Sequence, residues 1–264
     1  MIPKPVITVG IIGSGNLAWS LAANLKEYHF SIEQVISRNL ESAKAFAKHF
    51  EIPVASESIS EIFPDLDLVF LLTQDTFLKT VSEELAHSGG KNTLFVHCSG
   101  SAALEEISAG GRKLAVMWPL QTFSKNKILS LKNIPLFIEA EDSLLPEIRE
   151  IAQTLSEKVF FLNSGERQKM HLAAVISGNF STVLFSIAEK ISKETTGKGL
   201  ELFIPYLEEC LTKANEQGPM IALTGPAKRG DQNTMNKHIQ FLKKEGKTDE
   251  AELYSLMSKI IQKK

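Results

Sequence analysis

The sequence contains few cysteines, and their positions argue against a cysteine-based scaffold. Only Cys98 and Cys210 occur among the 264 residues, and they form neither a CxxC pair nor a metal-ligand spacing. Cys98 lies in an apolar run that is typical of a buried strand, which favours a reduced thiol over a disulfide. We therefore expect no metal centre and a reducing, cytoplasmic compartment.

An excess of charge and a long apolar run are also missing. The formal net charge is -2 at pH 7, so the composition gives no general basic field and does not favour nucleic acid as a partner. The first residues, MIPKPVITVGIIG, lack the apolar core of a signal peptide, and no apolar run is long enough to cross a bilayer. With 43% hydrophobic and 23% charged residues, the composition is typical of a soluble globular protein without a membrane partner.

The first part of the chain alternates short apolar runs with helical patterns. Near-continuous runs of Val, Ile, Leu and Phe are typical of parallel strands that are covered on both faces. Their alternation with helices predicts an α/β fold, a doubly wound, Rossmann-like parallel sheet. The apolar runs lie at 6–12, 32–36, 67–72, 93–98, 113–117, 134–138 and 158–162, and the helical patterns at 16–28, 40–50, 76–87 and 144–156.

After residue 162 the strand-like runs disappear and long helical patterns follow. Asn163, with Glu166 three positions later, predicts a capping box at the start of the first helix. We therefore predict a Rossmann-like domain at 1–162 and an all-α domain at 163–264. The helical patterns lie at 164–194, 199–217, 232–245 and 248–262, with an irregular stretch between the second and the third.

A glycine-rich loop follows the first predicted strand and opens the first predicted helix. Gly13, Gly15 and Ala18 match the G-x-G-x-x-G/A pattern in VGIIGSGNLAWSLAANL. Gly13 permits a tight turn, Gly15 leaves room for a pyrophosphate, and the helix N-terminus faces the anion. The alternative is a glycine turn without function, but motif and context agree. The predicted cofactor-binding residues of this loop are Gly13, Ser14, Gly15, Asn16 and Leu17.

The end of the second predicted strand carries Ser37 and Arg38 in place of an acidic residue. Proteins that select NAD usually have Asp or Glu here to hold the ribose hydroxyls. A carboxylate would repel a 2′-phosphate, whereas serine offers a hydroxyl and arginine a planar charged fork. The alternative is that Arg38 is a solvated surface charge. The position favours NADP as the cofactor.

Small polar residues follow two further strands at the same predicted edge of the sheet. Thr73 and Gln74 follow LVFLL, and Ser99, Gly100 and Ser101 follow LFVHC. Ligands of such sheets bind beyond the carboxyl ends of the strands. We expect Thr73, Gln74, Ser99 and Gly100 to lie against the nicotinamide ribose. The alternative, ordinary turn formers, weighs most for Ser101.

The first long helix of the second half carries His171, Gly178 and Asn179 within an otherwise apolar stripe. On an ideal helix His171 and Asn179 lie about 80° apart around the axis, so they share one broad face. An imidazole can deliver a proton near neutral pH, and a carboxamide can hold a substrate oxygen. The alternative is a core histidine bonded to a backbone carbonyl, with Asn179 bonded to a neighbouring helix.

A second polar cluster lies in ALTGPAKRGDQNTMNKH at 222–238. Lys228 and Arg229 precede the third helix and could clamp an anionic substrate. Arg229 could instead pair with an acid of the same domain. Asp231 is expected to cap the following helix, and His238 is expected to be structural.

Taken together, these motifs resemble a group of bacterial proteins that join a Rossmann-like NADP domain to a helical domain of unknown function. The resemblance covers nearly the whole chain. It implies an NADP oxidoreductase whose cofactor lies in the first domain. The motifs that carry it are IGSGNLA at 12–18, HCSGS at 97–101, PLQTFS at 119–124, HLAAVISGNF at 171–180 and ALTGPAKRGD at 222–231.

The group is similar to the wider 6-phosphogluconate dehydrogenase-like set, which includes β-hydroxyacid dehydrogenases, ketopantoate reductase, pyrroline-5-carboxylate reductase and the deazaflavin-dependent NADP reductase. In the hydroxyacid enzymes and ketopantoate reductase, a lysine in the first helix of the second domain is the catalytic acid or base, and an asparagine follows. The resemblance implies that His171 occupies the lysine position and that Asn179 matches the asparagine, while Val175 holds the nearer position. Trp118 departs from the histidine of many relatives and implies an altered pocket wall.

Residues and resemblance together predict an NADP(H)-dependent oxidoreductase that reduces a small anionic carbonyl substrate, a 2-oxo acid such as ketopantoate. The predicted catalytic residues are His171 as proton donor, with Asn179 and Ser99 orienting the substrate oxygen. Lys228 or Arg229 would bind the substrate carboxylate. The alternatives are an imine reductase, a deazaflavin-linked NADP reductase, and a regulator that senses NADP without turnover. Because related second domains pack helices between subunits, the resemblance also implies a homodimer through the helical domain.

Overall fold

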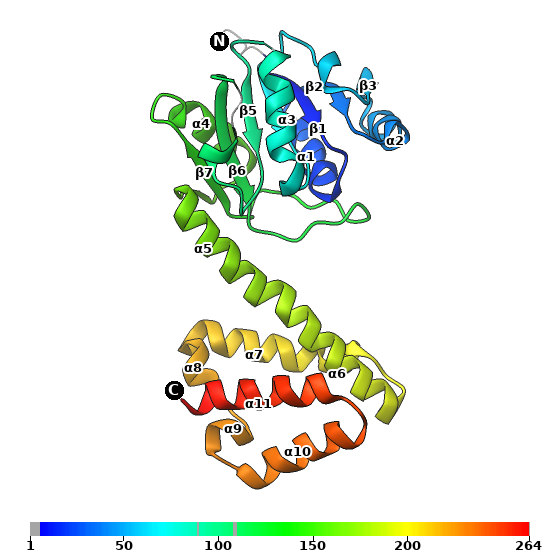
Figure 1. The fold of residues 1–264 in the computed structure, drawn as a ribbon, viewed down its shortest axis with the longest axis vertical. Coiled ribbons are helices and arrows are strands. Elements are labelled where there is room, and N and C mark those ends of the chain that lie inside the picture. The colour runs from blue at the N-terminus through cyan, green and yellow to red at the C-terminus, as the bar shows by residue number, and fades with distance from the viewer. Residues whose placement is uncertain (1–5, 89, 108–109, 264) are drawn as a thin grey trace. The chain divides into compact units, whose positions relative to one another are not determined.

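The apolar runs of the first part of the chain form an eight-stranded sheet in the order β3-β2-β1-β4-β5-β6-β7-β8 (Figure 1). The computed structural model describes residues 6–88, 90–107 and 110–263. All neighbouring strands are parallel except β6 and β7, which pair antiparallel and correct the predicted all-parallel arrangement in this one place. The strands are β1 (Thr8–Ile12), β2 (Ser31–Ile36), β3 (Val54–Ser56), β4 (Leu68–Leu71), β5 (Leu94–His97), β6 (Lys113–Pro119), β7 (Leu136–Ala140) and β8 (Val159–Phe161).

The edge strand β3 is the one strand of this sheet that was not predicted from the sequence. It has three residues, VAS, and its first two side chains are only partly buried. It pairs in parallel with β2, so it extends the sheet by one short strand. A segment of this length gives no readable alternation of apolar and polar residues.

The predicted α/β fold class is confirmed.

Helices cover both faces of the sheet, because the strand side chains alternate between two cores. In β4, Leu68 and Phe70 enter the core shared with α1, α2 and α4, whereas Val69 and Leu71 enter the core shared with α3. This two-sided burial is the physical reason for the near-continuous apolar runs. The helices are α1 (Asn16–Glu27), α2 (Leu40–Phe50), α3 (Asp75–His87) and α4 (Leu145–Leu155), with short 3-10 turns at η1 (Ile59–Glu61) and η2 (Leu104–Glu106).

Contacts divide the chain into two compact units, Met1–Val175 and Ile176–Lys264. Helix α5 (Ser164–Ala174) therefore packs with the sheet. It begins with the predicted capping box: Asn163 Oδ1 accepts a hydrogen bond from Glu166 N at 2.9 Å, and Glu166 Oε2 accepts one from Asn163 N at 3.0 Å. The predicted domain boundary after residue 162 stays a prediction, while these contacts assign α5 to the first unit.

A π-helical segment, η3 (Val175–Phe180), interrupts the long helix predicted at 164–194, and α6 (Ser181–Thr196) continues beyond it. Gly178 and Asn179 both lie in η3. In a π-helix the carbonyl of residue i accepts a hydrogen bond from the N–H of residue i+5, and such segments occur frequently at functional sites. The expectation that His171 and Asn179 share one face assumed ideal α-helical geometry, which this segment does not have.

The second unit is helical, as predicted, but buries little apolar surface. Among its described residues, the buried hydrophobic ones are Ala227, Met235, Leu242 and Ala251. The stretch predicted to be irregular contains two short helices, α8 and α9. The elements after α6 are η4 (Leu200–Phe203), α7 (Ile204–Gln217), α8 (Pro219–Ala222), α9 (Pro226–Arg229), α10 (Gln232–Lys244) and α11 (Thr248–Gln262).

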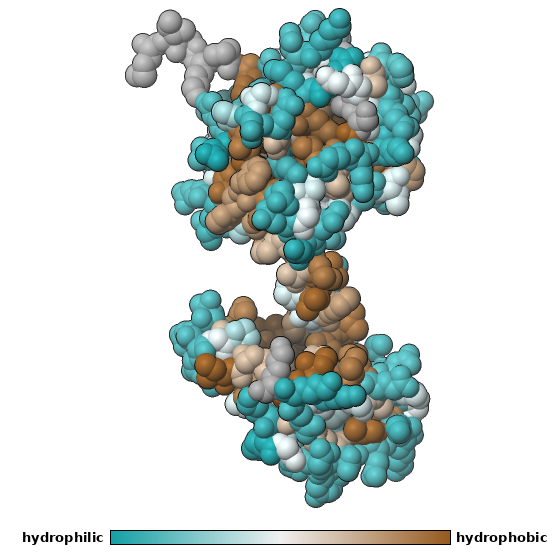
Figure 2. Space-filling model, turned by 60° about the vertical axis from the view of Figure 1, so that its left-hand side comes forward, coloured by the Kyte–Doolittle hydropathy of each residue, from teal (hydrophilic) through white to brown (hydrophobic). Residues whose placement is uncertain are grey.

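One helix of the described residues, Ser164–Thr196, is long and apolar enough to cross a membrane by length and composition, with a mean hydropathy of 1.4 over its most apolar stretch. This corrects the prediction that no apolar run of the sequence is long enough to cross a bilayer, since the helix passes that test although His171, Gly178 and Asn179 interrupt its apolar residues. Core helices of water-soluble proteins pass the same test. Figure 2 shows apolar surface along this helix and on the helical unit, where the exposed side chains include Ile176, Phe180, Val183 and Leu184.

Candidate functional site

The glycine loop between β1 and α1 has a backbone that only glycine allows at its first position. Gly13 has a φ of 111°, and a Cβ there would lie 2.4 Å from the Leu72 carbonyl oxygen. A Cβ on Gly15 would meet only that same oxygen, at 4.0 Å, so this side of the loop is open. Gly15 caps α1 without a side-chain hydrogen bond, which leaves the first N–H groups of the helix for an anion.

Beside this loop lies a hollow of about 490 Å³, which we call the first hollow. Ser14, Ser37 and Arg38 line it, and the Ser14 hydroxyl donates to Ser37 Oγ at 3.2 Å. The Arg38 guanidinium carbon lies 3.8 Å from the centre of the Phe77 ring, a cation–π contact that holds the side chain at the hollow. The structure thus brings the predicted NADP-selective pair together with the glycine loop.

A second hollow, of about 410 Å³, lies between the glycine loop and the ends of β4 and β5. Thr73 lines both hollows, and its Oγ1 is buried without a hydrogen-bond partner within the described ranges. A buried hydroxyl without a partner is costly unless a ligand or water meets it, so this atom fits a bound dinucleotide. The predicted cofactor residues Gly15, Asn16, Leu17, Thr73, Gln74 and Ser99 all line this second hollow.

Backbone N–H groups and a neighbouring hydroxyl hold the Ser99 side chain in place. Its Oγ accepts hydrogen bonds from Ser101 N at 3.1 Å and from Ala102 N at 2.9 Å. The Ser101 hydroxyl donates to the Asp75 carboxylate, so in its 3.5 Å contact with Ser99 the Ser99 hydroxyl is the donor, and a ligand would compete for that hydrogen. Cys98 also lines the second hollow, and burial raises the pKa of its thiol, which keeps it protonated.

His171 packs directly on the backbone that follows β5. A Cβ on Gly100 would lie 2.7 Å from His171 Cδ2 and 2.8 Å from Trp118 Cε2. Gly100 was predicted to make room for the nicotinamide ribose, but the space beside it is filled by these two rings. The rings meet edge to face, with centroids 5.7 Å apart. His171 therefore lies next to Ser99, which lines the second hollow.

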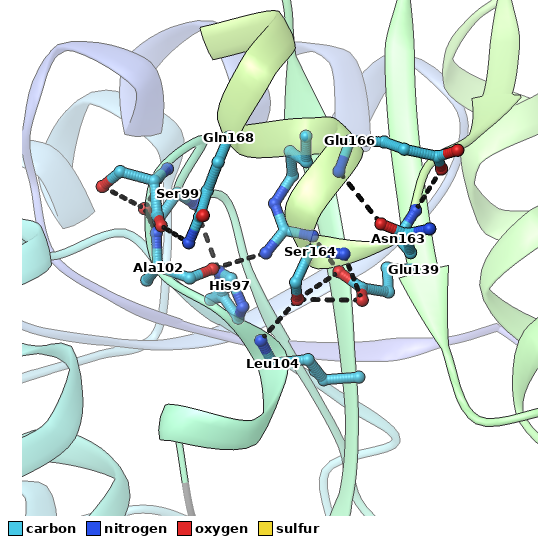
Figure 3. Close-up of polar contacts among 11 residues, drawn as sticks. His97, Ser99, Ala102, Leu104, Glu139, Asn163, Ser164, Glu166 and Gln168 are labelled. Carbon is cyan, nitrogen blue, oxygen red and sulfur yellow. Dashed lines mark hydrogen bonds and ion pairs between the residues drawn. The ribbon is translucent and has the colours of Figure 1, made fainter. Parts of the chain in front are cut away.

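A buried ion pair fixes the start of α5 to the sheet (Figure 3). Glu139 of β7 accepts hydrogen bonds from the Ser164 backbone N at 2.7 Å and from the Arg167 guanidinium. Arg167 is completely buried and also donates to the Ala102 carbonyl. Gln168 Nε2 donates to the Ser101 carbonyl at 3.0 Å. These contacts position the helix that carries His171 one turn later.

The imidazole of His97 is buried below the same cluster (Figure 3). Its Nδ1 accepts a hydrogen bond from Ser99 N at 3.3 Å, and its Nε2 has no partner among the described residues. Burial, followed by the positive charge of Arg167, lowers the pKa of His97 to about 3. His97 is therefore a neutral structural residue in the folded protein at physiological pH.

The remaining predicted residues belong to the second unit. Asn179 is exposed in η3, and Lys228 and Arg229 are exposed on α9. Their predicted contacts with a substrate stay predictions. Asp231 caps α10, as predicted, by accepting a hydrogen bond from Thr234 N at 3.0 Å, and this bond lowers the pKa of the carboxyl. His238 has a structural partner, the Tyr254 hydroxyl at 2.8 Å.

Several residues that the structure brings to the site were not predicted from the sequence. Glu139, Arg167 and His97 form the buried cluster, and Lys125 lines the first hollow. An arginine in the first turns of an apolar helix and a glutamate in the apolar run FIEA are both unusual core residues. Two residues of opposite charge, Glu139 and Arg167, each in a segment with an apolar pattern, were therefore the signal in the sequence that could have indicated the ion pair.

Two family models match the sequence. The N-terminal match, over residues 8–99, is to NADP oxidoreductases described as coenzyme F420-dependent. The C-terminal match, over residues 134–261, is to a domain of unknown function, DUF2520. No curated protein matches the chain.

Solved structures are similar over almost the full chain. A protein from Bacteroides fragilis, provisionally named an NADP oxidoreductase, is 31% identical with a TM-score of 0.89, covering 98% of this chain and 99% of its own. A Thermotoga maritima protein is 27% identical with a TM-score of 0.70, covering 97% of both chains. An imine reductase from Myxococcus stipitatus, solved with NADP+, is 14% identical with a TM-score of 0.64, covering 97% of this chain and 93% of its own.

Proposed function

The chain belongs to the family of NADP oxidoreductases that join a Rossmann-like domain to the helical domain of unknown function, and we propose that it reduces a small anionic carbonyl compound with NADPH. The proposed substrate is a 2-oxo acid, with ketopantoate as the first candidate. One observation supports this most strongly: His171 packs on Gly100, next to Ser99, at the edge of the sheet where the glycine loop lies. Carbonyl reduction requires a proton donor and a coenzyme cradle at one edge.

The residues of the first unit fit the coenzyme. The loop from Gly13 to Leu17 would bind the pyrophosphate at the start of α1, and Ser37 and Arg38 would bind the 2′-phosphate. The unpartnered Thr73 hydroxyl would bond to the coenzyme near the second hollow. When bound, NADPH supplies a hydride to the carbonyl carbon.

The chain's own residues would supply the proton and orient the substrate. As the carbonyl π electrons move to oxygen, that oxygen would take one proton from the protonated imidazole of His171. The Ser99 hydroxyl, with its oxygen already accepting two backbone N–H groups, would donate to the same oxygen. The roles of Asn179, Lys228 and Arg229 in holding the substrate are part of this proposal.

The proposed enzyme acts as a cytoplasmic homodimer. Large hydrophobic side chains of the helical unit are exposed in the single chain, and contiguous surfaces of this kind usually lie in protein interfaces. Burial against a second copy would also account for the apolar character of the helix Ser164–Thr196 without a membrane. The exposed residues include Leu202, Ile204, Tyr206, Leu211, Ile221, Leu256 and Ile260.

A second candidate substrate class is a cyclic imine, which the aromatic surroundings of His171 favour. Trp118 stacks on Phe137 with ring centroids 5.4 Å apart, and Phe137 in turn meets Phe160, which is half exposed. An apolar ring would pack on such a wall, whereas a short hydrophilic acid gains less from it. Reduction of an imine likewise adds a hydride to the carbon and a proton to the nitrogen of the C=N bond, so His171 keeps the role of proton donor.

The substrate class is tested by following NADPH oxidation with purified protein and a panel of 2-oxo acids, including ketopantoate, beside cyclic imines. We expect turnover with a 2-oxo acid and saturation with respect to that substrate. Turnover on imines alone would replace the first candidate with the second. Tight binding of NADPH without turnover on either class would overturn the enzymatic proposal and favour a regulator that senses NADP.

A further inference from the structure

The connection between β6 and β7, residues 120–135, is longer than its topology requires. Neighbouring antiparallel strands can be joined by a hairpin of about two to five residues. Here Leu120 N donates to the Pro135 carbonyl at 2.9 Å, so the two ends lie side by side. Between them the chain runs out as a long loop along the edge of the sheet where α1 begins (Figure 1). We call residues 120–135 the strap.

Two buried polar side chains of α1 hold the strap. Ser20 Oγ accepts a hydrogen bond from Leu129 N at 3.1 Å. Asn24 Nδ2 donates to the Leu129 carbonyl at 2.8 Å, and Asn24 Oδ1 accepts from Leu131 N at 2.9 Å. Leu131 itself lies in the core that α1 shares with the sheet. Because buried amides need their hydrogen bonds met, this pairing fixes the path of the strap.

The strap brings a lysine to the hollow beside the glycine loop. Lys125 lines the first hollow together with Ser37 and Arg38, although it lies far from both in the sequence. The strap turns at this place, where Ser124 and Lys127 form an isolated antiparallel bridge. The ammonium group therefore stands on an anchored segment.

The charges that line the first hollow show what Lys125 contributes. Glu57 and Glu84 line it as well, so Arg38 alone would face two carboxylates. One positive and two negative side chains would repel a phosphate. With Lys125 the hollow has two positive and two negative side chains, so this net repulsion is removed. Arg38 is held over the Phe77 ring and presents a planar fork. Lys125 adds a compact charge on a flexible stem, which suits a phosphate approached from another direction.

We infer that Lys125 is the second cationic residue for the 2′-phosphate of NADPH and a determinant of the preference for NADPH over NADH. This inference rests on the proposed function, because it concerns the coenzyme of that reaction. Ser37 and Arg38 approach the phosphate from the end of β2, and Lys125 approaches it from the strap. The buried Asn24 and Ser20 act as positioning residues for Lys125.

The test compares K125Q with K127Q, which removes an exposed lysine of the same strap that does not line the hollow. The Kd values of NADPH and NADH are measured by titration calorimetry at one fixed ionic strength. We expect K125Q to raise the Kd of NADPH by about tenfold or more, since a hydrogen bond to a charged group contributes at least this factor. The Kd of NADH should change by less than about twofold, because NADH lacks the 2′-phosphate and an exposed lysine contributes little through screened charge interactions. K127Q should leave both Kd values near those of the wild type.

The outcomes separate this inference from the function on which it rests. If the wild type prefers NADPH and K125Q keeps the full preference, the inference is wrong and the proposed function stands. An equal rise of both Kd values in K125Q also overturns it, because Lys125 then acts on the whole dinucleotide. If the wild type binds neither coenzyme, or binds NADH more tightly, the proposed function itself fails.

Discussion

The two units of this chain bury their apolar residues to very different extents. In the first, strands such as β4 bury every side chain between helices on two faces, and large residues such as Phe70 and Phe95 are completely buried. In the second, the described hydrophobic residues that are buried are Ala227, Met235, Leu242 and Ala251, while Leu211 is 73% and Ile221 is 75% exposed. The first unit has a core of its own, and the second presents an apolar surface that a partner could cover.

This contrast decides which functional assignments a single chain supports. Residues of the first unit, such as Thr73, Ser99 and His171, are held by contacts within that unit, so a single chain defines their surroundings. Asn179, Lys228 and Arg229 stand on a unit whose apolar side chains have few partners in one chain. A second copy that covers this surface would bury apolar area at about 25 cal/mol per Å² and complete the surroundings of these residues.

The largest loss in the free energy of unfolding of the first unit is expected from Glu139→Gln. The change leaves the completely buried Arg167 guanidinium without its carboxylate, and an uncompensated buried charge destabilises a protein by about 3–5 kcal/mol. Both tryptophans of the chain lie in the first unit, so tryptophan fluorescence during urea unfolding reports on it.

The matched control is Glu157→Gln, which breaks an exposed pair with Lys132 at 3.5 Å. Exposed pairs contribute about 0–1 kcal/mol, so this variant should unfold almost as the wild type does. If Glu139→Gln unfolds like the control, the stability of the first unit does not depend on its buried ion pair.

The next largest effect is expected on the association of two chains through the exposed apolar surface of the second unit. Phe180→Asp places a charge on an exposed apolar position of η3, and such a change in the centre of an interface weakens association by about 2–4 kcal/mol. Sedimentation equilibrium should give twice the 29.2 kDa chain mass for the wild type and a shift towards the single chain for the variant. Lys190→Asp, on an exposed polar position of α6, should leave the mass unchanged. A wild type that sediments as a single chain would reject the dimer.

A pair of glycines in the two units should respond with opposite signs. Gly100→Ala places a Cβ 2.7 Å from His171 Cδ2, and overpacking of this kind costs about 1–3 kcal/mol. A methyl group on Gly178 would meet nothing within 4 Å among the described residues, so Gly178→Ala should stabilise its helix by about 0.5–1 kcal/mol. Scanning calorimetry measures both variants, and a loss of stability in Gly178→Ala would show that a second copy of the chain packs directly on Gly178.

The smallest effect is a pH dependence of the first unit. Burial, followed by the charge of Arg167, lowers the pKa of His97 to about 3 from its ordinary value of 6.5. Below pH 6.5 the unfolded chain binds a proton that the folded chain does not, so stability falls as the pH falls from 6.5 towards 3. Between about pH 6.5 and 5.5 the loss is about 1 kcal/mol. Urea unfolding of His97→Asn at both pH values should lack this difference, and an equal slope in both proteins would contradict the assignment.

Patterns along the chain predicted the elements, because each rests on neighbouring residues. Seven strands and the helices of both units follow from periodicity, and the capping box of Asn163 and Glu166 follows from their spacing. The strand β3 was missed because three residues carry too little pattern. The glycine loop and the pair Ser37 and Arg38 were found because their contacts depend on a local strand–turn–helix motif.

The contacts that are distant in the sequence could not be predicted in this way. Arg167 meets Glu139 only because α5 returns to β7, and Lys125 reaches the first hollow only because α1 anchors the strap. Gly100 was assigned to the coenzyme, while its missing Cβ makes room for His171 and Trp118. Each of these depends on the packing of segments that no periodicity relates.

The proposed function depends most on His171, which would donate the proton in a reduction at the edge of the sheet. The most direct measurement is single-turnover oxidation of bound NADPH in His171→Gln, beside His87→Asn at the exposed end of α3. We predict that His171→Gln slows reduction by about 10²–10⁴-fold and leaves the Kd of NADPH unchanged, while His87→Asn behaves as the wild type. Reduction at the wild-type rate in His171→Gln would exclude His171 as the proton donor.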